Sequence, residues 1–90
     1  MAIEVKVPTI LRTYTGGQKV VAGEGGTLAE VIDDVESEHS GIKARLVEGD
    51  GLRRFVNVYV NDEDVRFTGG LATSVNDGDT VVILPAVAGG

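Results

Sequence analysis

Near the N-terminus, apolar residues alternate with charged residues along the chain. Residues 3–7 read Ile-Glu-Val-Lys-Val, which is the period of a half-buried strand. Pro8 ends this strand, and the polar segment 9–17, which closes with two glycines, predicts a loop. A second short strand is expected over residues 18–22, antiparallel to the first, and the glycine-rich stretch 23–26 ends it.

The clearest helix signal begins at Thr27. Thr27 and Glu30 have the S/T-x-x-E spacing of a capping box, in which both side chains accept hydrogen bonds from free backbone N–H groups. Four apolar residues then recur at the spacing i, i+3, i+4 and i+7 and predict one buried stripe, formed by Leu28, Val31, Ile32 and Val35. Gly41 can adopt the left-handed conformation that commonly follows a helix.

The second half of the chain contains the strongest strand signal. Residues 42–51 predict an irregular connection with room for one helical turn ending at Leu46. Residues 55–60 are rich in β-branched and aromatic side chains and predict a strand whose three valines share one face. The remaining predicted elements are a turn at residues 61–62, a short strand at 65–67 and a last strand at 80–84.

The order of these elements predicts the fold. One helix covers only one face of a sheet, so the chain should form a two-layer α+β domain with a mixed sheet of four to five strands. A right-handed crossover after the first hairpin places the last strand beside the first and parallel to it, which is the β-grasp, or ubiquitin-like, arrangement. We assign residues 1–84 to this domain and residues 85–90 to a flexible C-terminal tail.

Composition excludes several classes of function. The formal net charge of −6 disfavours nucleic acid and anionic membranes as partners and favours basic protein surfaces. The 90 residues contain no cysteine, which excludes disulfides, zinc–thiolate sites and a side-chain persulfide. The N-terminal residues lack the pattern of a signal peptide, and the longest apolar run, residues 81–88, is too short to span a membrane. We therefore expect a cytoplasmic protein.

Signals for catalysis are weak. His39 is the single histidine, so no transition-metal site can be built from histidine and cysteine. The acidic run at residues 61–64 lacks the glycine and the closing glutamate of a calcium loop. The glycines before the helix fail the G-x-G-x-x-G pattern, because its third glycine would stand at the position of Leu28.

The C-terminus carries the strongest chemical signal. Five small residues follow Pro85, namely Ala86, Val87, Ala88, Gly89 and Gly90. A segment of this kind has little more girth than bare backbone and suits threading into a narrow channel of another protein. Glycine at the end removes Cβ crowding, so a nucleophile can reach the terminal carboxyl carbon. Gly90 is therefore the residue we expect to carry the chemistry.

These segments resemble the MoaD/ThiS superfamily of sulfur carriers. The resemblance is strongest over residues 55–67, 69–73 and 82–90. The opening, at residues 7–12 and 15–19, looks most like one branch, the CysO-type carrier of cysteine biosynthesis. It is loosest over residues 36–54, where the connection looks short for that branch.

The resemblance implies partners and a chemical role. In that family a ubiquitin-activating-type adenylyltransferase and sulfurtransferase consumes ATP to adenylate the terminal carboxylate, and sulfur then replaces AMP to leave a thiocarboxylate, here on Gly90. Residues 86–89 would be the tether that threads into the partner. A pyridoxal-phosphate cysteine synthase using O-phosphoserine would take up the sulfur, and a JAMM-type metallopeptidase would release cysteine. The carrier itself would bind no cofactor and would not be an enzyme.

The pleat of the last strand predicts a docking surface. If Val81 and Ile83 point into the core, then Val82 and Leu84 point outward just before the tail and form a small patch for partners. The alternative is that both pairs are buried, with the helix covering one face and a loop the other.

The same sequence features are compatible with other functions. Within the same class, the chain could be the small subunit of molybdopterin synthase, or a sulfur carrier for thiamine or a secondary metabolite. From a different class, it could be a ubiquitin-like modifier whose Gly90 becomes attached to lysines of target proteins. It could also be a plain interaction domain with an inert tail.

Overall fold

The described residues form two sheets and two α-helices. The computed structural model describes residues 2–49, 51–53 and 56–85. The main sheet has the strand order β2-β1-β7-β5-β6, and a small second sheet pairs β3 with β4. The strands are β1 (Ile3–Lys6), β2 (Val20–Gly23), β3 (Val47–Glu48), β4 (Gly51–Leu52), β5 (Val56–Val60), β6 (Glu63–Asp64) and β7 (Thr80–Pro85). The helices are α1 (Leu28–Glu38) and α2 (Ile42–Leu46), with the short 3-10 helices η1 (Thr9–Thr15), η2 (Val65–Phe67) and η3 (Gly70–Ala72).

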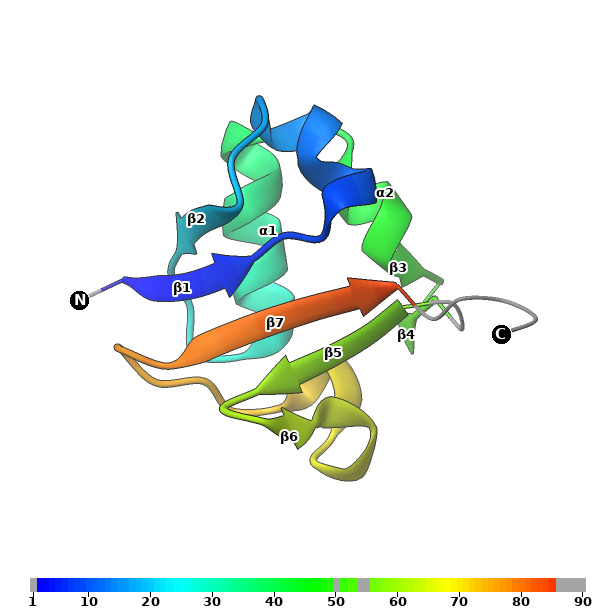
Figure 1. Ribbon diagram of the computed structural model, residues 1–90. Helices are drawn as coiled ribbons and strands as arrows, with labels where there is room; N and C mark the ends of the chain where they lie inside the picture. Colours follow the sequence, from blue (N-terminus) through cyan, green and yellow to red (C-terminus); the bar gives the residue numbers. More distant parts are fainter. Residues whose placement is uncertain (1, 50, 54–55, 86–90) are drawn as a thin grey trace.

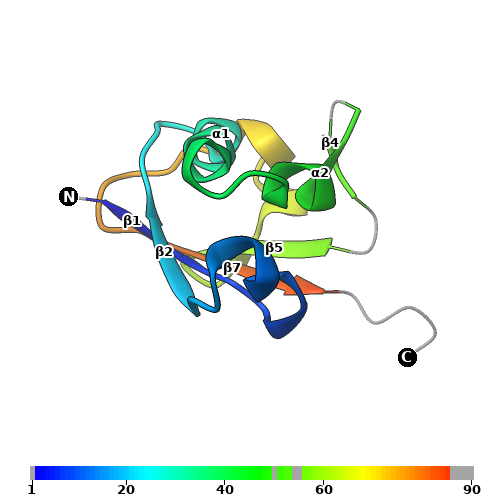
Figure 2. The ribbon, with the colours of Figure 1, turned by 90° about the horizontal axis from the view of Figure 1, so that it is seen from above.

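The topology confirms the predicted β-grasp. β1 pairs antiparallel with β2 and parallel with β7, so the last strand lies beside the first, as the crossover rule requires. β7 also pairs antiparallel with β5. Both α-helices lie on one face of the main sheet, and the opposite face is open (Figures 1 and 2). The domain therefore has two layers, with one sheet face packed and one accessible.

The predicted capping box and apolar stripe position α1. Thr27 Oγ1 accepts a hydrogen bond from the Glu30 backbone N–H at 3.3 Å, and Glu30 Oε1 accepts one from the Gly26 N–H at 2.7 Å. All four residues of the stripe are buried. They pack on the inner faces of the sheet, where the core residues include Val5, Val58 and Val81. The helix is thus held by its apolar face and fixed at its start by side-chain hydrogen bonds.

Two predicted segments of the first half differ from the structure. Residues 9–15, predicted as part of a loop, form η1 instead, because Leu11 packs into the core and Thr15 Oγ1 donates hydrogen bonds to backbone carbonyl oxygens. Gly41 does adopt a left-handed conformation, with φ +100°, yet it starts α2, while α1 ends earlier, at a cap on His39. The one helical turn ending at Leu46 is confirmed as α2.

The predicted strand at residues 65–67 is wrong. The segment is the 3-10 helix η2, because Asp64 Oδ1 accepts a hydrogen bond from the Arg66 N–H at 2.9 Å and caps a helical turn. The strand that pairs with β5 is β6, directly after the turn at Asn61 and Asp62. Both turn residues have positive φ, which confirms the predicted turn.

Candidate functional site

The end of β7 is where the predicted reactive tail leaves the domain. β7 reaches Pro85, one residue further than predicted, and Pro85 stands opposite Val56 of β5. Residues 86–90, with the predicted reactive Gly90 and its tether of Gly89, Ala88, Val87 and Ala86, lie outside the described residues. The structure therefore defines the base of the tail and the surfaces around it.

Side chains of β7 alternate between the core and the open face. Val81 and Ile83 are buried, whereas Leu84 is 46% exposed and Val82 is half-buried. The orientation predicted for the docking patch is therefore confirmed, and the alternative with both pairs buried is wrong. The reason is that α1 and α2 cover only the inner face of the sheet. Docking of a partner on Val82 and Leu84 stays a prediction.

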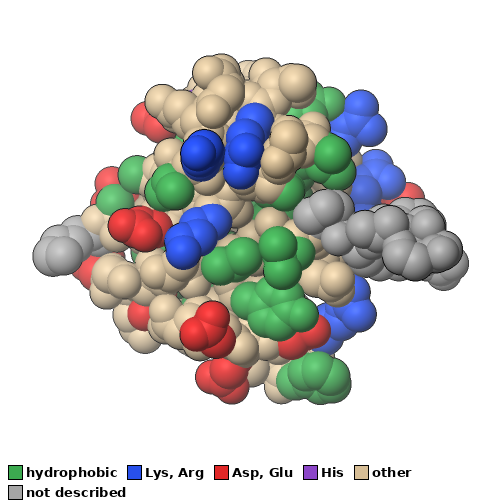
Figure 3. Space-filling view, in the orientation of Figure 1, with side chains coloured by type: hydrophobic (Ala, Val, Ile, Leu, Met, Phe, Trp, Pro, Cys, Tyr) green, Lys and Arg blue, Asp and Glu red, His purple; other side chains and the backbone are tan. Residues whose placement is uncertain are grey.

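Apolar side chains gather on the open face beside the base of the tail. Val82 stands opposite Tyr59 of β5, and Leu84 stands opposite Asn57. We call Tyr59, Val82 and Leu84 the outer patch. Phe67 of η2 is also exposed, at 86%, and Figure 3 shows hydrophobic side chains gathered on the face of the sheet beside the end of β7. Exposed apolar area of this kind is typical of a contact surface.

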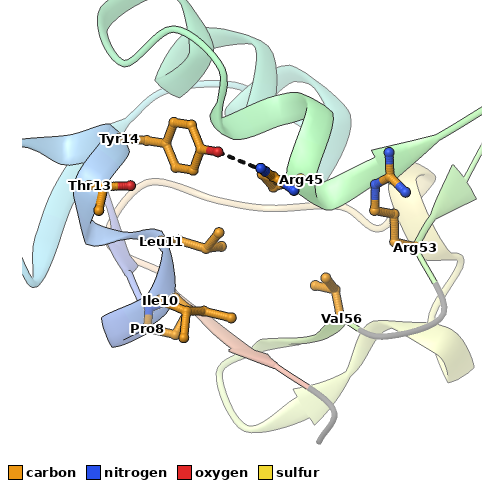
Figure 4. A pocket seen from close by; sticks show the side chains of 8 residues that line it. All are labelled: Pro8, Ile10, Leu11, Thr13, Tyr14, Arg45, Arg53 and Val56. Carbon is orange, nitrogen blue, oxygen red and sulfur yellow. Dashed lines mark hydrogen bonds between the residues drawn. The ribbon is translucent and has the colours of Figure 1, made fainter. Parts of the chain in front are cut away.

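A groove lies on the other side of the tail base. Its volume is about 520 Å³, and Figure 4 shows the side chains that line it, which come from Pro8 and η1, from α2, from Arg53 just after β4, and from β5. It is lined by Pro8, Ile10, Leu11, Thr13, Tyr14, Arg45, Arg53 and Val56. We call it the arginine groove. Because Val56 stands opposite Pro85, the groove is adjacent to the point where the tail begins.

Tyr14 fixes Arg45 at the wall of the arginine groove. The Arg45 Nε–H donates a hydrogen bond to Tyr14 Oη at 2.7 Å, and the guanidinium carbon lies 5.8 Å from the ring centroid. The ring can approach α2 closely because Gly41 has no side chain; a Cβ there would lie 3.0 Å from two ring atoms. The sequence does not predict this site, because its residues come from separate segments that form no motif.

Charge is unevenly distributed over the surface. Figure 3 shows Lys and Arg side chains on the side where β7 ends as well as over η1 and β1, whereas most of the visible Asp and Glu side chains lie away from the end of β7. At the opposite end of β7, Asp79 accepts hydrogen bonds from the Asn61 side chain and the Asn76 backbone N–H, which hold its pKa below the ordinary value. The net charge of −6 therefore does not describe the environment of the tail base.

The described residues contain neither a metal cluster nor a membrane-spanning helix. They include no group of three or more His, Asp or Glu side chains that could hold a metal ion. None of the helices in this part of the chain has the length and apolar character needed to span a bilayer. The acidic run at residues 61–64 forms the turn and β6, as its predicted turn suggested.

Known proteins resemble this chain over its whole length. The model of the ThiS family matches residues 5–90. "Sulfur carrier protein CysO" of Mycobacterium tuberculosis is 60% identical, and the alignment covers 100% of both chains. "Small archaeal modifier protein 3" of Haloferax volcanii is 32% identical, again over 100% of both chains. The chain therefore belongs to the ThiS family.

The solved structures agree with this assignment. A chain in the crystal structure of the Amycolatopsis orientalis BexX/CysO complex superimposes with a TM-score of 0.95 at 67% identity. The superposition covers 99% of this chain and 100% of that one. That structure holds a carrier of this fold together with a partner protein.

Proposed function

We propose that this member of the ThiS family is the sulfur carrier of a cysteine biosynthesis pathway, with the sulfur held as a thiocarboxylate on Gly90. The observation that carries the proposal is the full-length identity of 60% with a CysO sulfur carrier, on a chain that ends in Gly-Gly. The chain is a carrier and not an enzyme, so its partners supply the catalysis.

The proposed chemistry has two steps at the terminal carboxyl group, the first at its oxygen and the second at its carbon. The Gly90 carboxylate attacks the α-phosphorus of ATP, and pyrophosphate leaves as the acyl adenylate forms. A sulfide equivalent then attacks the acyl carbon, AMP leaves, and the oxygen lost with AMP is replaced by sulfur. The activating enzyme consumes the ATP, and the carrier holds no cofactor. Without cysteine, the chain has no thiol of its own that could exchange with the bound sulfur.

Three enzymes would act on the tail in turn. The first is a ubiquitin-activating-type adenylyltransferase and sulfurtransferase, and the second is a pyridoxal-phosphate cysteine synthase that uses O-phosphoserine. The third is a JAMM-type metallopeptidase that frees cysteine. The tether of Ala86, Val87, Ala88 and Gly89 would thread into each active site. The structure of a CysO with BexX supports the general point that a carrier of this fold binds a partner protein.

The outer patch is the proposed docking surface for these partners. It is apolar, it lies on the face of the main sheet opposite α1 and α2, and Leu84 is one residue from Pro85 at the tail base. A partner that packs on the patch would therefore sit next to the segment that it must thread.

Intact-mass spectrometry tests the proposal. The full chain is incubated with ATP, sulfide and the cognate activating enzyme, and we expect a gain of about 16 Da, the difference between sulfur and oxygen. A variant that lacks Gly90 is the control and should keep its mass. Absence of the gain in the full chain, with an enzyme that activates another carrier in the same assay, would contradict the proposal.

A second function is favoured by one relative. The Haloferax volcanii protein that is 32% identical is described as a modifier, which implies attachment to other proteins. A modifier would use the same activated Gly90, but its final acceptor would be a lysine amine. Cells expressing the chain would then accumulate isopeptide-linked adducts that disappear when Gly90 is deleted. A sulfur carrier alone would give the mass gain without such adducts.

A further inference from the structure

The arginine groove presents positive charge beside an apolar wall. Ile10, 66% exposed, and the core residue Leu11 come from η1, and Val56 comes from the start of β5. Arg45 and Arg53 lie across the groove from the η1 side chains (Figure 4). The function proposed above does not use this surface, although the groove is adjacent to the tail base.

Both guanidinium groups are held in place. Tyr14 positions Arg45 through a hydrogen bond and its ring. Arg53 donates from Nε to the Ala44 backbone carbonyl oxygen at 2.7 Å. Arginine side chains lose considerable rotamer entropy when they bind, so anchoring them in advance reduces that loss.

The neighbouring carboxylates are mostly engaged elsewhere. Asp33 pairs with Lys43, and Glu36 accepts hydrogen bonds from the backbone N–H groups of Gly41 and Lys43. Within the part of the chain that the structure describes, no carboxylate forms an ion pair with Arg45. Arg53 has only a solvent-exposed contact with Glu48 at 3.4 Å, which contributes little. The groove therefore presents positive charge available to a partner.

We propose that the arginine groove binds an acidic segment of the activating enzyme that adenylates Gly90. Carboxylates of the enzyme would face Arg45 and Arg53, and an apolar side chain beside them would pack on Ile10 and Val56. The inference rests on the proposed function. Both proposed fates of Gly90, as a sulfur carrier and as a modifier, require the activating enzyme. We therefore assign the contact beside the tail base to the adenylation step.

The position of the arginine groove explains how it would strengthen binding of the activating enzyme. An enzyme that binds the outer patch contacts the domain on one side of the tail base. A second contact in the arginine groove would lie on the other side. Once the enzyme has bound the outer patch, its acidic segment is held near the arginine groove at a high effective concentration. The second contact therefore increases the affinity of the enzyme for the carrier without the full entropy cost of a separate association. The charged contact would also orient the carrier during diffusional encounter, with the tail side toward the enzyme.

Steady-state kinetics with the cognate activating enzyme test this proposal. ATP–pyrophosphate exchange is measured against carrier concentration for the full chain and for the variants Arg45→Glu, Ile10→Ser and Lys19→Glu. Arg45→Glu should lower kcat/KM on the order of tenfold at low salt. Most of this change should be a higher KM, because charges at the edge of an interface mainly affect the rate at which the two proteins associate. The reduction should shrink as salt screens the charges.

The other two variants separate charge from shape. Ile10→Ser should lower kcat/KM about threefold at every salt concentration, because an apolar contact is not screened. Lys19→Glu is the matched control: Lys19 is exposed, lies outside the groove and gives the same change in net charge. It should stay within about twofold of the unchanged chain.

Each outcome decides one of the two proposals. If the unchanged chain is adenylated and Arg45→Glu matches Lys19→Glu at low salt, the groove proposal is wrong and the carrier function stands. If the unchanged chain supports no exchange with its cognate enzyme, the carrier function is wrong and the groove proposal falls with it. Circular dichroism spectra of the variants check that each is folded.

Discussion

Truncating Ile83 to alanine removes a side chain from the centre of the domain. Ile83 is 3% exposed and borders the same small apolar space as Val5, Leu28, Val31 and Val58. Isoleucine-to-alanine changes at buried sites cost about 2–5 kcal/mol, part of it from the cavity that remains. Helix α1 and the strands beside β7 are fixed by their own contacts, so the site can collapse little. We expect a loss of about 3 kcal/mol in the free energy of unfolding.

The adjacent residue should respond very differently. Leu84 is 46% exposed, so alanine there removes methylene groups that are only about half-buried. At about 0.8 kcal/mol for each fully buried group, the expected loss is about 1 kcal/mol. Urea unfolding monitored by circular dichroism measures both values. Equal losses for Ile83→Ala and Leu84→Ala would mean that β7 does not present its faces as described.

The same variant tests the outer patch. Leu84→Ala should fold and yet raise the KM of the activating enzyme for the carrier about fivefold, because an interface contact worth about 1 kcal/mol is lost. Val20→Ala is a close control, since Val20 has the same exposed fraction of 46% but lies on the edge strand β2. If both variants change KM equally, docking on the outer patch is refuted.

Two further predictions concern stability. Gly25→Ala should lower the free energy of unfolding by about 1–3 kcal/mol, because a Cβ there would lie 2.6–2.9 Å from atoms of Glu30 and Val31 in the first turn of α1. Gly51→Ala is the control. Its Cβ would meet nothing within 4 Å, so the free energy of unfolding in the same urea titration should be nearly unchanged. Backbone N–H groups at the start of α2 donate hydrogen bonds to Glu36 and lower its pKa below the ordinary 4.5. The ionised carboxylate therefore stabilises the fold above pH 4.5. This contribution is lost as the pH falls through the lowered pKa. Glu36→Gln should therefore be less stable than the unchanged chain at pH 7, with a difference that fades on acidification; an equal difference at both ends of the pH range would rule out the charge as its cause.

Elements with a regular apolar period were predictable from the sequence. The i, i+3, i+4, i+7 stripe predicted α1, alternation predicted β1, and β-branched and aromatic residues predicted β5. The crossover rule then placed β7 beside β1. The pleat of the last strand indicated that Val82 and Leu84 face outward if Val81 and Ile83 are buried, which the structure bears out.

Short segments held by individual side chains were not predictable in this way. η1 and η2 are too short for a period, and η2 exists where the Asp64 side chain caps a turn in a stretch that otherwise favours a strand. The strands β3 and β4 contain two residues each and were expected as irregular chain. The arginine groove was beyond sequence reasoning because Tyr14 and Arg45 are 31 residues apart and meet only in the folded chain.

The placement of charge revises the inference drawn from net charge alone. A total of −6 predicted basic partner surfaces, yet the side chains beside the tail base include Arg45 and Arg53. Screening confines electrostatic docking to about 8–10 Å, so a partner responds to the charges near its contact and not to the sum over the chain. An acidic remainder would repel an acidic enzyme surface, whereas the side with the arginine groove would attract it. The combination therefore favours one orientation of approach, in which the side that carries Pro85 and the arginine groove faces the enzyme.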